Sequence, residues 1–261
     1  MDSIEPDISI IVPARDNGTL TLSFLDSVHD ALDFIQAEIL VIDETGGRLA
    51  GQLSADHPEI MVYECSKNET LGQATNQALN QALRLATARY LSLWQPDTTL
   101  QPDCLRTLLN FLDDTPETGI VGPRVHAENG RILRSAGLFP STFSLFRLLG
   151  LGTHQRIMPH PAEMFIFAPE FNKPAEVDWL MAGCLIIRRE TIAEIGWPEP
   201  NFSPQFAALD LCRRSRLAGW HNHYVPTAAI SKLALPELVA SWPDSLRFIL
   251  RKWRDLLFLR G

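Results

Sequence analysis

The sequence predicts an α/β protein built around a mostly parallel β-sheet with helices on both faces. Short, continuous runs of apolar and β-branched residues alternate along the chain with longer segments whose apolar residues recur at helical spacing. Continuous apolar strands are typical of parallel sheets that are buried on both faces. Their alternation with helices predicts right-handed crossover connections between parallel neighbours.

The first part of the chain is the most regular. Its expected strands are residues 8–13 (ISIIVP), 38–42 (EILVI), 60–65 and 90–94, and its expected helices are residues 20–35, 71–88 and 103–112. We expect Thr19 or Thr21 to cap the first helix, and Pro102 or Asp103 to begin the third, because these residue types favour helix starts.

Two acidic residues come directly after predicted parallel strands. Asp43 follows the strand at 38–42, and Asp97 lies just beyond the strand at 90–94. The carboxyl ends of parallel strands meet at one edge of a sheet, which is where open α/β sheets bind ligands. The two carboxylates are therefore expected to face one crevice.

The second part of the chain is less regular. Its expected elements are a strand at 119–125, a strand–turn–strand at 177–188, helices at 190–195 and 209–218, a strand at 223–225 and an amphipathic helix at 237–259. Gly219 is expected to end the second of these helices as its C-cap. The stretch 141–175 is rich in Phe, Pro and His and carries few regular signals, and an irregular segment of this length is usually functional.

Composition narrows the class of protein. The chain has 261 residues, is 46% hydrophobic and 21% charged, and has a net charge of -8. These values are ordinary for a globular protein with a substantial core. The acidic balance argues against a nucleic-acid partner, because counterion release from nucleic acid needs a basic surface.

The cysteines and the hydropathy indicate where the protein works. None of the four cysteines forms a C-x-x-C pair, and this scatter is typical of buried thiols in a reducing compartment. The N-terminus is acidic with too short an apolar run for a signal peptide, and no apolar stretch approaches the ~20 residues of a membrane span. We predict a cytoplasmic protein, or one that lies at the periphery of a membrane.

Several short motifs follow one another in an order that resembles a known family. They are residues 12–17 (VPARDN), 42–46 (IDETG), Asn68 with Gly72, 74–76 (ATN), 94–97 (WQPD), 177–190 (VDWLMAGCLIIRRE), 195–196 (IG) and 210–220 (DLCRRSRLAGW). In this order they resemble the family 2 glycosyltransferases, especially the bacterial rhamnosyltransferase-like branch, over roughly residues 7 to 232. Each motif alone is weak, and the shared order carries the resemblance.

The resemblance implies a fold and a reaction. The fold would be of GT-A type: a Rossmann-like, mostly parallel sheet with helices on both faces, fused to a smaller acceptor-side mixed region. Residues 1–100 would be the nucleotide-sugar-binding half, 101–232 the acceptor-side half, and 233–261 a C-terminal amphipathic helix. The reaction would transfer a sugar, with inversion, from a nucleotide-diphosphate sugar to a hydroxyl of a glycan or lipid-linked acceptor.

The resemblance also implies site residues. Asp43, with Glu44, would hold the base and the ribose, and Asp97 would lie by the ribose and the diphosphate's metal ion. Further expected residues are Asn68, Asn76 and Lys232 for the nucleotide sugar, and Asp178 and Gly183 on the acceptor side.

The chain departs from the family's pattern at the catalytic base. Inverting transfer needs a group that takes the acceptor's proton. Counted back without a gap from Asp210-Leu211, the family's Glu-Asp pair falls on Ala207 and Ala208, and a methyl group accepts no proton. Glu199 is a weak substitute candidate, so the catalytic base is unknown.

The expected metal ligands are altered as well. A neutral amide, Gln95, stands where the family has the first Asp of Asp-x-Asp, and Lys232 stands where it has a late His. A divalent cation, Mn²⁺ or Mg²⁺, would retain Asp97 as an expected ligand, whereas Gln95 is a poor ligand for such a hard ion. The ammonium group of Lys232 could instead place a positive charge beside a diphosphate.

Simpler roles exist for most of these residues. Asp43 and Asp97 could cap helices or turns, Lys232 could be a surface lysine, Asp178 could pair with the backbone, and Asp210 could be structural. His221 and His223 share one face of a strand, but without an evident third ligand they are expected to face solvent rather than a metal.

Two hypotheses about function follow. The first is an active glycosyltransferase with an atypical or metal-independent site. The second is a catalytically silent glycosyltransferase-like domain that binds a nucleotide, a glycan or a partner enzyme. The C-terminal basic helix could contact an anionic membrane or a partner, or pack on its own domain. A nucleotidyltransferase is disfavoured because residues 14–18 (ARDNG) are not a glycine-rich phosphate loop.

Overall fold

The computed structural model describes residues 6–14, 18–64, 88–133, 135–138, 166–167, 172–197 and 204–233. The expected helices at 71–88 and 237–259, and most of the irregular stretch at 141–175, lie outside these ranges. None of the helices that the structure describes is long and apolar enough to cross a membrane.

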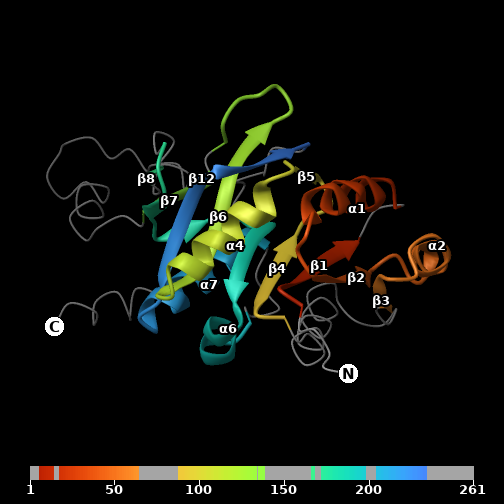
Figure 1. Ribbon diagram of the computed structural model, residues 1–261, viewed down its shortest axis with the longest axis horizontal. Helices are drawn as coiled ribbons and strands as arrows, with labels where there is room; N and C mark the ends of the chain where they lie inside the picture. Colours follow the sequence, from red (N-terminus) through yellow and green to blue (C-terminus); the bar gives the residue numbers. More distant parts are fainter. Residues whose placement is uncertain are drawn as a thin grey trace, which may run out of the picture.

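A central sheet runs through both halves of the chain (Figure 1). Its strand order is β3-β2-β1-β4-β11-β6-β12-β5, and the short β9 pairs with β12. The strands are β1 (Ile8–Ala14), β2 (Ala37–Asp43), β3 (Met61–Glu64), β4 (Tyr90–Trp94), β5 (Thr98–Leu100), β6 (Thr118–Ala127), β9 (Ala175–Glu176), β11 (Cys184–Arg188) and β12 (His221–Lys232). A smaller sheet, of order β10-β7-β8, contains β7 (Ala136–Leu138), β8 (Ile166–Phe167) and β10 (Trp179–Leu180).

The strand directions confirm the mostly parallel prediction, and three strands, β11 and the short β5 and β9, run against the others. β1 is parallel to both β2 and β4, β2 is parallel to β3, and β6 is parallel to β12. β11 enters between β4 and β6 and is antiparallel to both. β12 then pairs antiparallel with the short β5, which follows β4 in the chain. This last pairing brings the end of β12 to the segment that follows β4.

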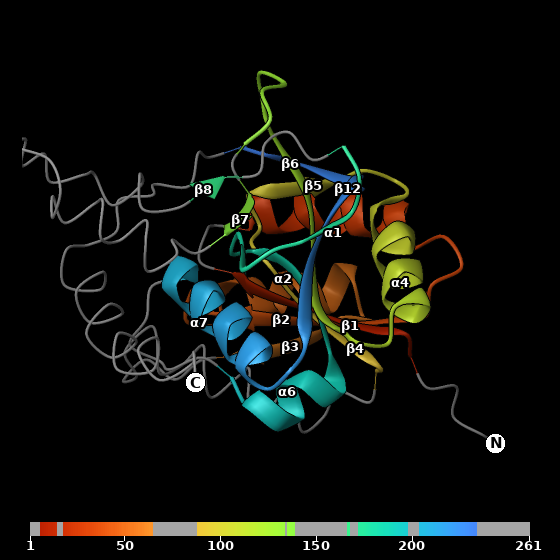
Figure 2. The ribbon, with the colours of Figure 1, turned by 90° about the vertical axis from the view of Figure 1, so that its left-hand side faces the viewer.

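Helices cover both faces of the sheet, as predicted. α1 (Thr19–Leu32), α2 (Arg48–Asp56) and α4 (Cys104–Asp114) contribute to one apolar core, while α6 (Arg189–Ile195) and α7 (Pro204–Leu217) contribute to another. Figure 2 shows α4 and α7 on opposite sides of β6 and β12. The two cores are separated by the sheet, so the side chains of β4 and β11 alternate between them.

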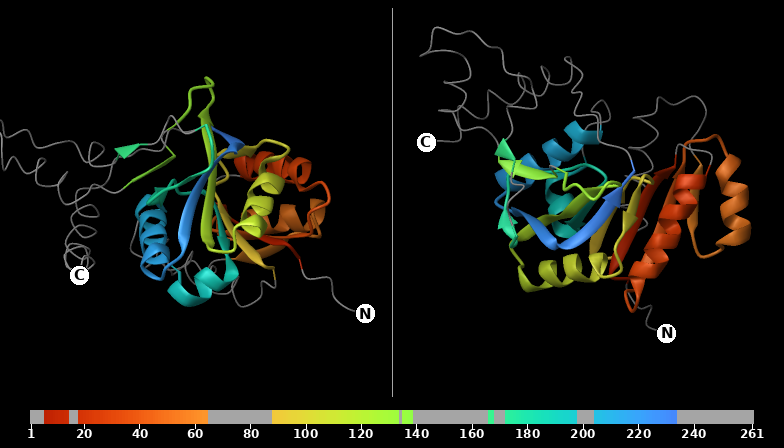
Figure 3. Two further views of the ribbon diagram at one scale, coloured as in Figure 1. Left: turned by 60° about the vertical axis from the view of Figure 1, so that its left-hand side comes forward. Right: turned by 90° about the horizontal axis from the view of Figure 1, so that it is seen from above.

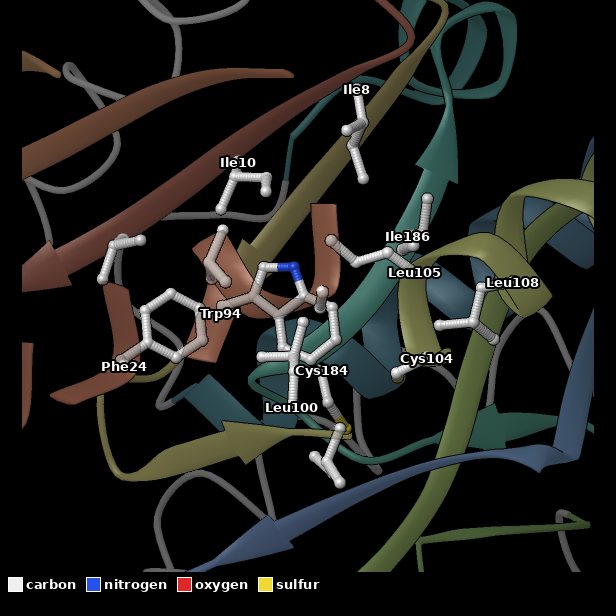
Figure 4. Close-up of a cluster of buried hydrophobic side chains, with 14 of the residues drawn as sticks. Ile8, Ile10, Phe24, Trp94, Leu100, Cys104, Leu105, Leu108, Cys184 and Ile186 are labelled. Carbon is white, nitrogen blue, oxygen red and sulfur yellow. The ribbon is translucent and has the colours of Figure 1, made fainter. Parts of the chain in front are cut away.

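Trp94 lies at the centre of the first core (Figure 4). Its side chain is fully buried, and its ring centroid is 6.2 Å from that of Phe24 on α1. Leu100 and Cys104 belong to the same cluster. Replacing a buried Trp by Ala typically costs about 3–5 kcal/mol. Because Trp94 is the last residue of β4, this packing fixes the start of the turn that carries Gln95 and Asp97.

Several boundaries differ from those expected. α2 and β5 were not predicted, because α2 is short and contains a glycine and β5 has only three residues. Gly18, rather than Thr19 or Thr21, precedes α1 as its N-cap, and Asp103 precedes α4 without a side-chain cap hydrogen bond. β12 is also much longer than the expected strand at 223–225.

The expected C-cap at Gly219 is confirmed. Gly219 has φ of 93°, its N–H donates to the Arg216 carbonyl at 3.1 Å, and the N–H of Trp220 donates to the Ser215 carbonyl at 3.0 Å. This pair of bonds is a Schellman motif, which satisfies carbonyls that the end of α7 would leave without partners.

Candidate functional site

Sheet pairing brings Lys232 to the turn that follows β4. Thr98 closes this turn, because its N–H and hydroxyl donate to the Gln95 carbonyl at 3.2 and 2.7 Å. Lys232 is the register partner of Thr98 between β12 and β5, and the N–H of Leu233 donates to the Asp97 carbonyl at 2.9 Å. Two segments 135 residues apart in sequence therefore meet through backbone hydrogen bonds.

The Lys232 ammonium group binds both polar side chains of the turn. Its Nζ donates to Asp97 Oδ1 at 2.6 Å and to Gln95 Oε1 at 2.8 Å. The Lys232 side chain is 3% exposed and that of Asp97 is 22% exposed. A buried ammonium needs such partners, because burial of an unpaired charge is costly. We call Gln95, Asp97 and Lys232 the cation triad.

In the cation triad, the Lys232 ammonium group binds the oxygens that Asp97 and Gln95 would offer to a divalent metal ion. Mn²⁺ and Mg²⁺ favour several oxygen ligands, carboxylates above all. Here the one carboxylate is paired with an ammonium group, the Gln95 amide oxygen accepts from the same ammonium group, and Lys232 offers no lone pair. The positive charge at this position is supplied by the protein.

Gly183 lies directly against Gln95. The Gln95 N–H donates to the Gly183 carbonyl at 3.1 Å. Gly183 has φ of +81°, and a Cβ built on it would lie 2.5 Å from Gln95 Cγ. The turn between β10 and β11 thus limits where the Gln95 side chain can go. The expected acceptor-side role of Gly183 stays a prediction.

Asp43 is fully buried and both of its oxygens are used within the fold. Oδ1 accepts from the N–H and hydroxyl of Thr45 at 2.7 and 2.5 Å, and Oδ2 accepts from the N–H groups of Leu49 and Ala50 at 3.1 and 3.0 Å. The last two are N–H groups of the first turn of α2, so Asp43 caps that helix. A contact between Asp43 and a nucleotide stays a prediction.

The two strand-end positions lie at the same edge of the sheet. β2 and β4 flank β1 and run parallel to it, so Asp43 and the turn with Asp97 both follow carboxyl ends. Glu44 follows Asp43, is half-buried, and donates its N–H to the Ala14 carbonyl at 3.0 Å. Of the other expected nucleotide residues, Asn68 and Asn76 lie outside the described residues, as does Glu199.

No carboxylate stands at the expected base position. Ala208, on α7, is 3% exposed and belongs to the second core with Trp179 and Leu180, and Ala207 is half-buried. Two residues along α7, Asp210 Oδ2 accepts from Arg214 Nε at 2.8 Å, in a pair whose side chains are 6% and 25% exposed. Asp210 therefore has the structural role expected of it.

Asp178 is held by an arginine of α7. Arg216 Nη1 donates to Asp178 Oδ1, and Arg216 Nη2 lies 3.5 Å from Glu176 Oε1. The Asp178 N–H donates to the Gly137 carbonyl at 2.8 Å. These contacts join the small sheet to α7, and contact of Asp178 with an acceptor stays a prediction.

His221 and His223 lie on one face of β12, as predicted, and both are only partly exposed. Their ring centroids are 6.2 Å apart. His221 Nδ1 lies 3.2 Å from Glu176 Oε2, and His223 Nδ1 lies 3.0 Å from the Thr118 hydroxyl. The His223 ring also packs 5.1 Å from that of Phe111, and burial lowers the pKa of His223 below the ordinary value of 6.5.

A second polar cluster lies at the opposite edge of the sheet. His29 of α1, His57 after α2 and Glu59 before β3 place three ligand-type atoms within 4.8 Å of one another. Within the part of the chain that the structure describes, this is the one such group of His, Cys, Asp or Glu side chains. It was missed from the sequence because the two histidines are 28 positions apart and belong to no motif.

Comparison with known proteins agrees with this architecture. The model of the glycosyl transferase family 2 matches residues 9–196. N-acetylglucosaminyl-diphospho-decaprenol L-rhamnosyltransferases from two Mycobacterium tuberculosis strains are 26% identical over 186 residues, which cover 67% of this chain and 59% of theirs. "Uncharacterized protein y4gI" from Sinorhizobium fredii is 23% identical over 264 residues, with 95% of this chain and 28% of that protein covered.

Solved structures show the same fold at low sequence identity. GalNAc-T7 with UDP, GalNAc and Mn²⁺ has a TM-score of 0.64 at 13% identity and covers 98% of this chain and 50% of its own. The mannosyltransferase PcManGT from Pyrobaculum calidifontis, with GDP-Man and Mn²⁺, has a TM-score of 0.62 at 17% identity. The match covers 97% of this chain and 66% of the mannosyltransferase chain. The fold is thus that of GT-A glycosyltransferases, and the family match extends over most of the chain, so the protein belongs to glycosyl transferase family 2.

Proposed function

We propose that this protein transfers a sugar, with inversion, from a nucleotide-diphosphate sugar to a glycan or lipid-linked acceptor, and that it does so without a divalent metal ion. Family membership supports the reaction class. The rhamnosyltransferase relatives are named for a lipid-diphosphate acceptor, which supports an acceptor of that kind here. The chain spans 59% of the length of these relatives.

The single observation that carries metal independence is the cation triad. As the acceptor hydroxyl attacks the anomeric carbon, the bond to the diphosphate breaks and negative charge collects on the leaving group. An ammonium group has three donors, and Lys232 uses two of them on Asp97 and Gln95. The third can donate to a diphosphate oxygen, with no metal ion needed at that position.

The remaining parts of the site are assigned by position. The nucleoside would lie along the carboxyl edge of β2 and β1, near Glu44, with Asn68 and Asn76 as further contacts. The acceptor would enter from the side of Gly183 and Asp178. The proton of the acceptor hydroxyl must go to a base other than residue 208, and Glu199 is the substitute candidate. The reaction would take place in the cytoplasm, with residues 233–261, for which the sequence predicts an amphipathic helix, as a contact to a membrane or a partner protein.

Calorimetric titration with UDP, dTDP and GDP tests the proposal directly. One nucleotide is expected to bind equally well with Mn²⁺ and with excess chelator. Lys232→Ala is expected to weaken this binding at least tenfold, or by about 1.4 kcal/mol. Lys173→Ala removes an exposed positive charge of the same kind and serves as the matched control. Binding that requires Mn²⁺ or Mg²⁺ would overturn metal independence.

A catalytically silent domain is the second candidate, and the two alanines favour it. Ala208 is buried among apolar side chains, so nothing at that position takes a proton. Under this proposal the protein binds a nucleotide, a glycan or a partner enzyme and transfers nothing.

Transfer assays separate the two candidates. Wild-type protein that binds a nucleotide sugar but neither transfers nor hydrolyses the sugar is the result expected of the silent domain. In that case Ala208→Asp should create activity if the missing carboxylate is the only lesion. The substitution buries a carboxylate and will lower stability, so Ala208→Asn, which has nearly the same size and no charge, is its control. No gain in an Ala208→Asp variant that still folds and binds nucleotide would count against residue 208 as the base position.

A further inference from the structure

Three ligand-type side chains from two separate segments converge at the amino edge of the sheet. His29 lies near the end of α1, and His57 and Glu59 lie between α2 and β3. Figure 3 shows α1 and α2 next to each other at one end of the molecule. α1 and α2 each lead from the carboxyl end of one strand to the amino end of the next, which is β2 for α1 and β3 for α2. The C-terminal ends of both helices therefore lie at the opposite edge of the sheet from Asp43 and Asp97. This group is therefore separate from the cation triad.

The distances within the group match those of a metal site. His29 Nε2 lies 3.6 Å from Glu59 Oε1, and His57 Nδ1 lies 3.4 Å from the same oxygen. Ligands about 2.1 Å from a tetrahedral ion are separated by about 3.4 Å. The three ligand atoms all lie within 4.8 Å of one another, so both rings and the carboxylate are within reach of one ion.

The ligand set selects a class of metal. Two imidazole nitrogens and one carboxylate suit a borderline ion such as Zn²⁺ better than Mg²⁺ or Ca²⁺, which favour oxygen. The side chains are 40% (His29), 23% (His57) and 53% (Glu59) exposed, so an ion can reach them from solvent and keep a water as its fourth ligand.

We propose that His29, His57 and Glu59 form a Zn²⁺-binding site that joins the end of α1 to the connection between α2 and β3. A bound ion would hold together two segments that form the outer part of the β3-β2-β1 side of the sheet. Since an ion that binds the folded state and not the unfolded state adds stability, Zn²⁺ should raise the melting temperature. The site is structural and plays no part in sugar transfer.

The experiment is a calorimetric titration of full-length, tag-free protein with ZnCl₂ at pH 7.5, followed by thermal melts with and without the ion. We expect one ion per chain to bind and the melting temperature to rise. His29→Ala and His57→Ala should each weaken Zn²⁺ binding at least about tenfold, on the scale seen when metal sites are perturbed. His126→Ala is the matched control, because His126 is partly exposed and lies at the far end of β6.

Two results would overturn the proposal. One is the absence of saturable Zn²⁺ binding to the wild-type chain, and the other is binding that persists undiminished in the His29→Ala/His57→Ala double variant. A simple contact between Glu59 and the two histidines would leave the melting temperature unchanged on addition of Zn²⁺. Zn²⁺ binding should weaken on acidification, because a protonated imidazole cannot ligate a metal.

Nucleotide binding reports separately on the two proposals. The His29→Ala/His57→Ala variant is expected to bind nucleotide as the wild type does, with or without Zn²⁺. Loss of Zn²⁺ binding with intact nucleotide binding supports this site whether or not the cation triad binds a diphosphate.

Discussion

Gly183 and Gln95 are in contact so close that residue 183 has no room for a side chain. A Cβ on Gly183 would lie 2.5 Å from Gln95 Cγ and 2.7 Å from Gln95 Oε1, the oxygen that accepts from Lys232. The backbone between β10 and β11 therefore sets the position of one member of the cation triad. This contact also joins the connection between β10 and β11 to the turn that follows β4.

Gly183→Ala should displace Gln95 and destabilise the protein. Ala at a positive φ costs roughly 1–2 kcal/mol by itself, and the clash with Gln95 adds to this cost. Gly130→Ala is the control that measures the cost of the positive φ alone, because Gly130 has φ of +77° and no heavy atom within 4 Å of the added Cβ. Urea denaturation should show a larger loss for Gly183→Ala than for Gly130→Ala. Equal losses would mean that Gln95 moves aside at no cost.

Lys232 and Asp97 should be strongly coupled in stability. Lys232→Met leaves a partly buried carboxylate without its cation, and we expect the free energy of unfolding to fall by about 3 kcal/mol, at the low end for broken buried pairs. The double variant Lys232→Met/Asp97→Asn removes both charges and should recover part of this loss. The coupling energy of the double-mutant cycle measures the pair, and additive losses would show that the two side chains do not interact in solution.

Nucleotide binding by the Asp97→Asn variant should show whether the diphosphate is bound by Lys232 or by a metal ion. If Lys232 binds the diphosphate, removal of its counter-charge leaves the ammonium group more attractive to phosphate, and nucleotide affinity should be maintained or rise. If Asp97 is a metal ligand, affinity in Mn²⁺ should fall. Calorimetry of this variant with and without chelator distinguishes the two outcomes, and it requires no acceptor.

Two buried thiols should resist alkylation. Burial raises the pKa of Cys184 to about 12 and that of Cys212 to about 12, and both side chains are almost inaccessible. The thiolate is the reactive form, so iodoacetamide at pH 8 should leave both residues unmodified in the native protein and label them in urea. Mass spectrometry of tryptic peptides provides the measurement. Rapid native labelling of Cys184 would imply that the region beneath the cation triad opens.

His223 should make stability depend on pH near neutrality. Burial lowers its folded-state pKa below 6.5, with Glu176 and Glu117 acting in the opposite direction and His221 in the same one. The unfolded chain therefore binds more protons as the pH falls through 6.5, and the free energy of unfolding should decrease there. His223→Gln should flatten this dependence, whereas His126→Gln should not. Denaturation curves between pH 5.5 and 7.5 would show the difference, and an unchanged slope would exclude His223 as the cause.

The sequence predicted the sheet well where local pattern and tertiary environment agree. The strand at 90–94 was placed to the residue, and β1, β2 and α4 were placed within one or two residues of their ends. Each has an apolar pattern that matches how its two faces are buried. The pattern fails for α2, whose sequence RLAGQLSAD is weakly helical. That helix forms where Asp43 accepts its first N–H groups and where Leu49 and Leu53 join the core.

The candidate site was predicted in part. The sequence singled out Gln95, Asp97 and Lys232, and the structure brings them into direct contact. It also singled out Asp43, whose hydrogen bonds are those of a cap rather than of an open binding group. Neither the Gly183 contact nor the histidine group was foreseen, because both join residues that no periodicity relates.

The sequence by itself determined the alternation of strands and helices, the parallel core of the sheet and the order of motifs that marks family 2, together with the lack of a carboxylate at residue 208. These are properties of composition and local spacing. Only the tertiary structure decided which polar groups meet: Lys232 with Asp97, Asp43 with the start of α2, and His29 with Glu59. Strand order and register decide these contacts, because they determine which residues that are distant in sequence become neighbours in space. A side-chain hydrogen bond forms only between such neighbours.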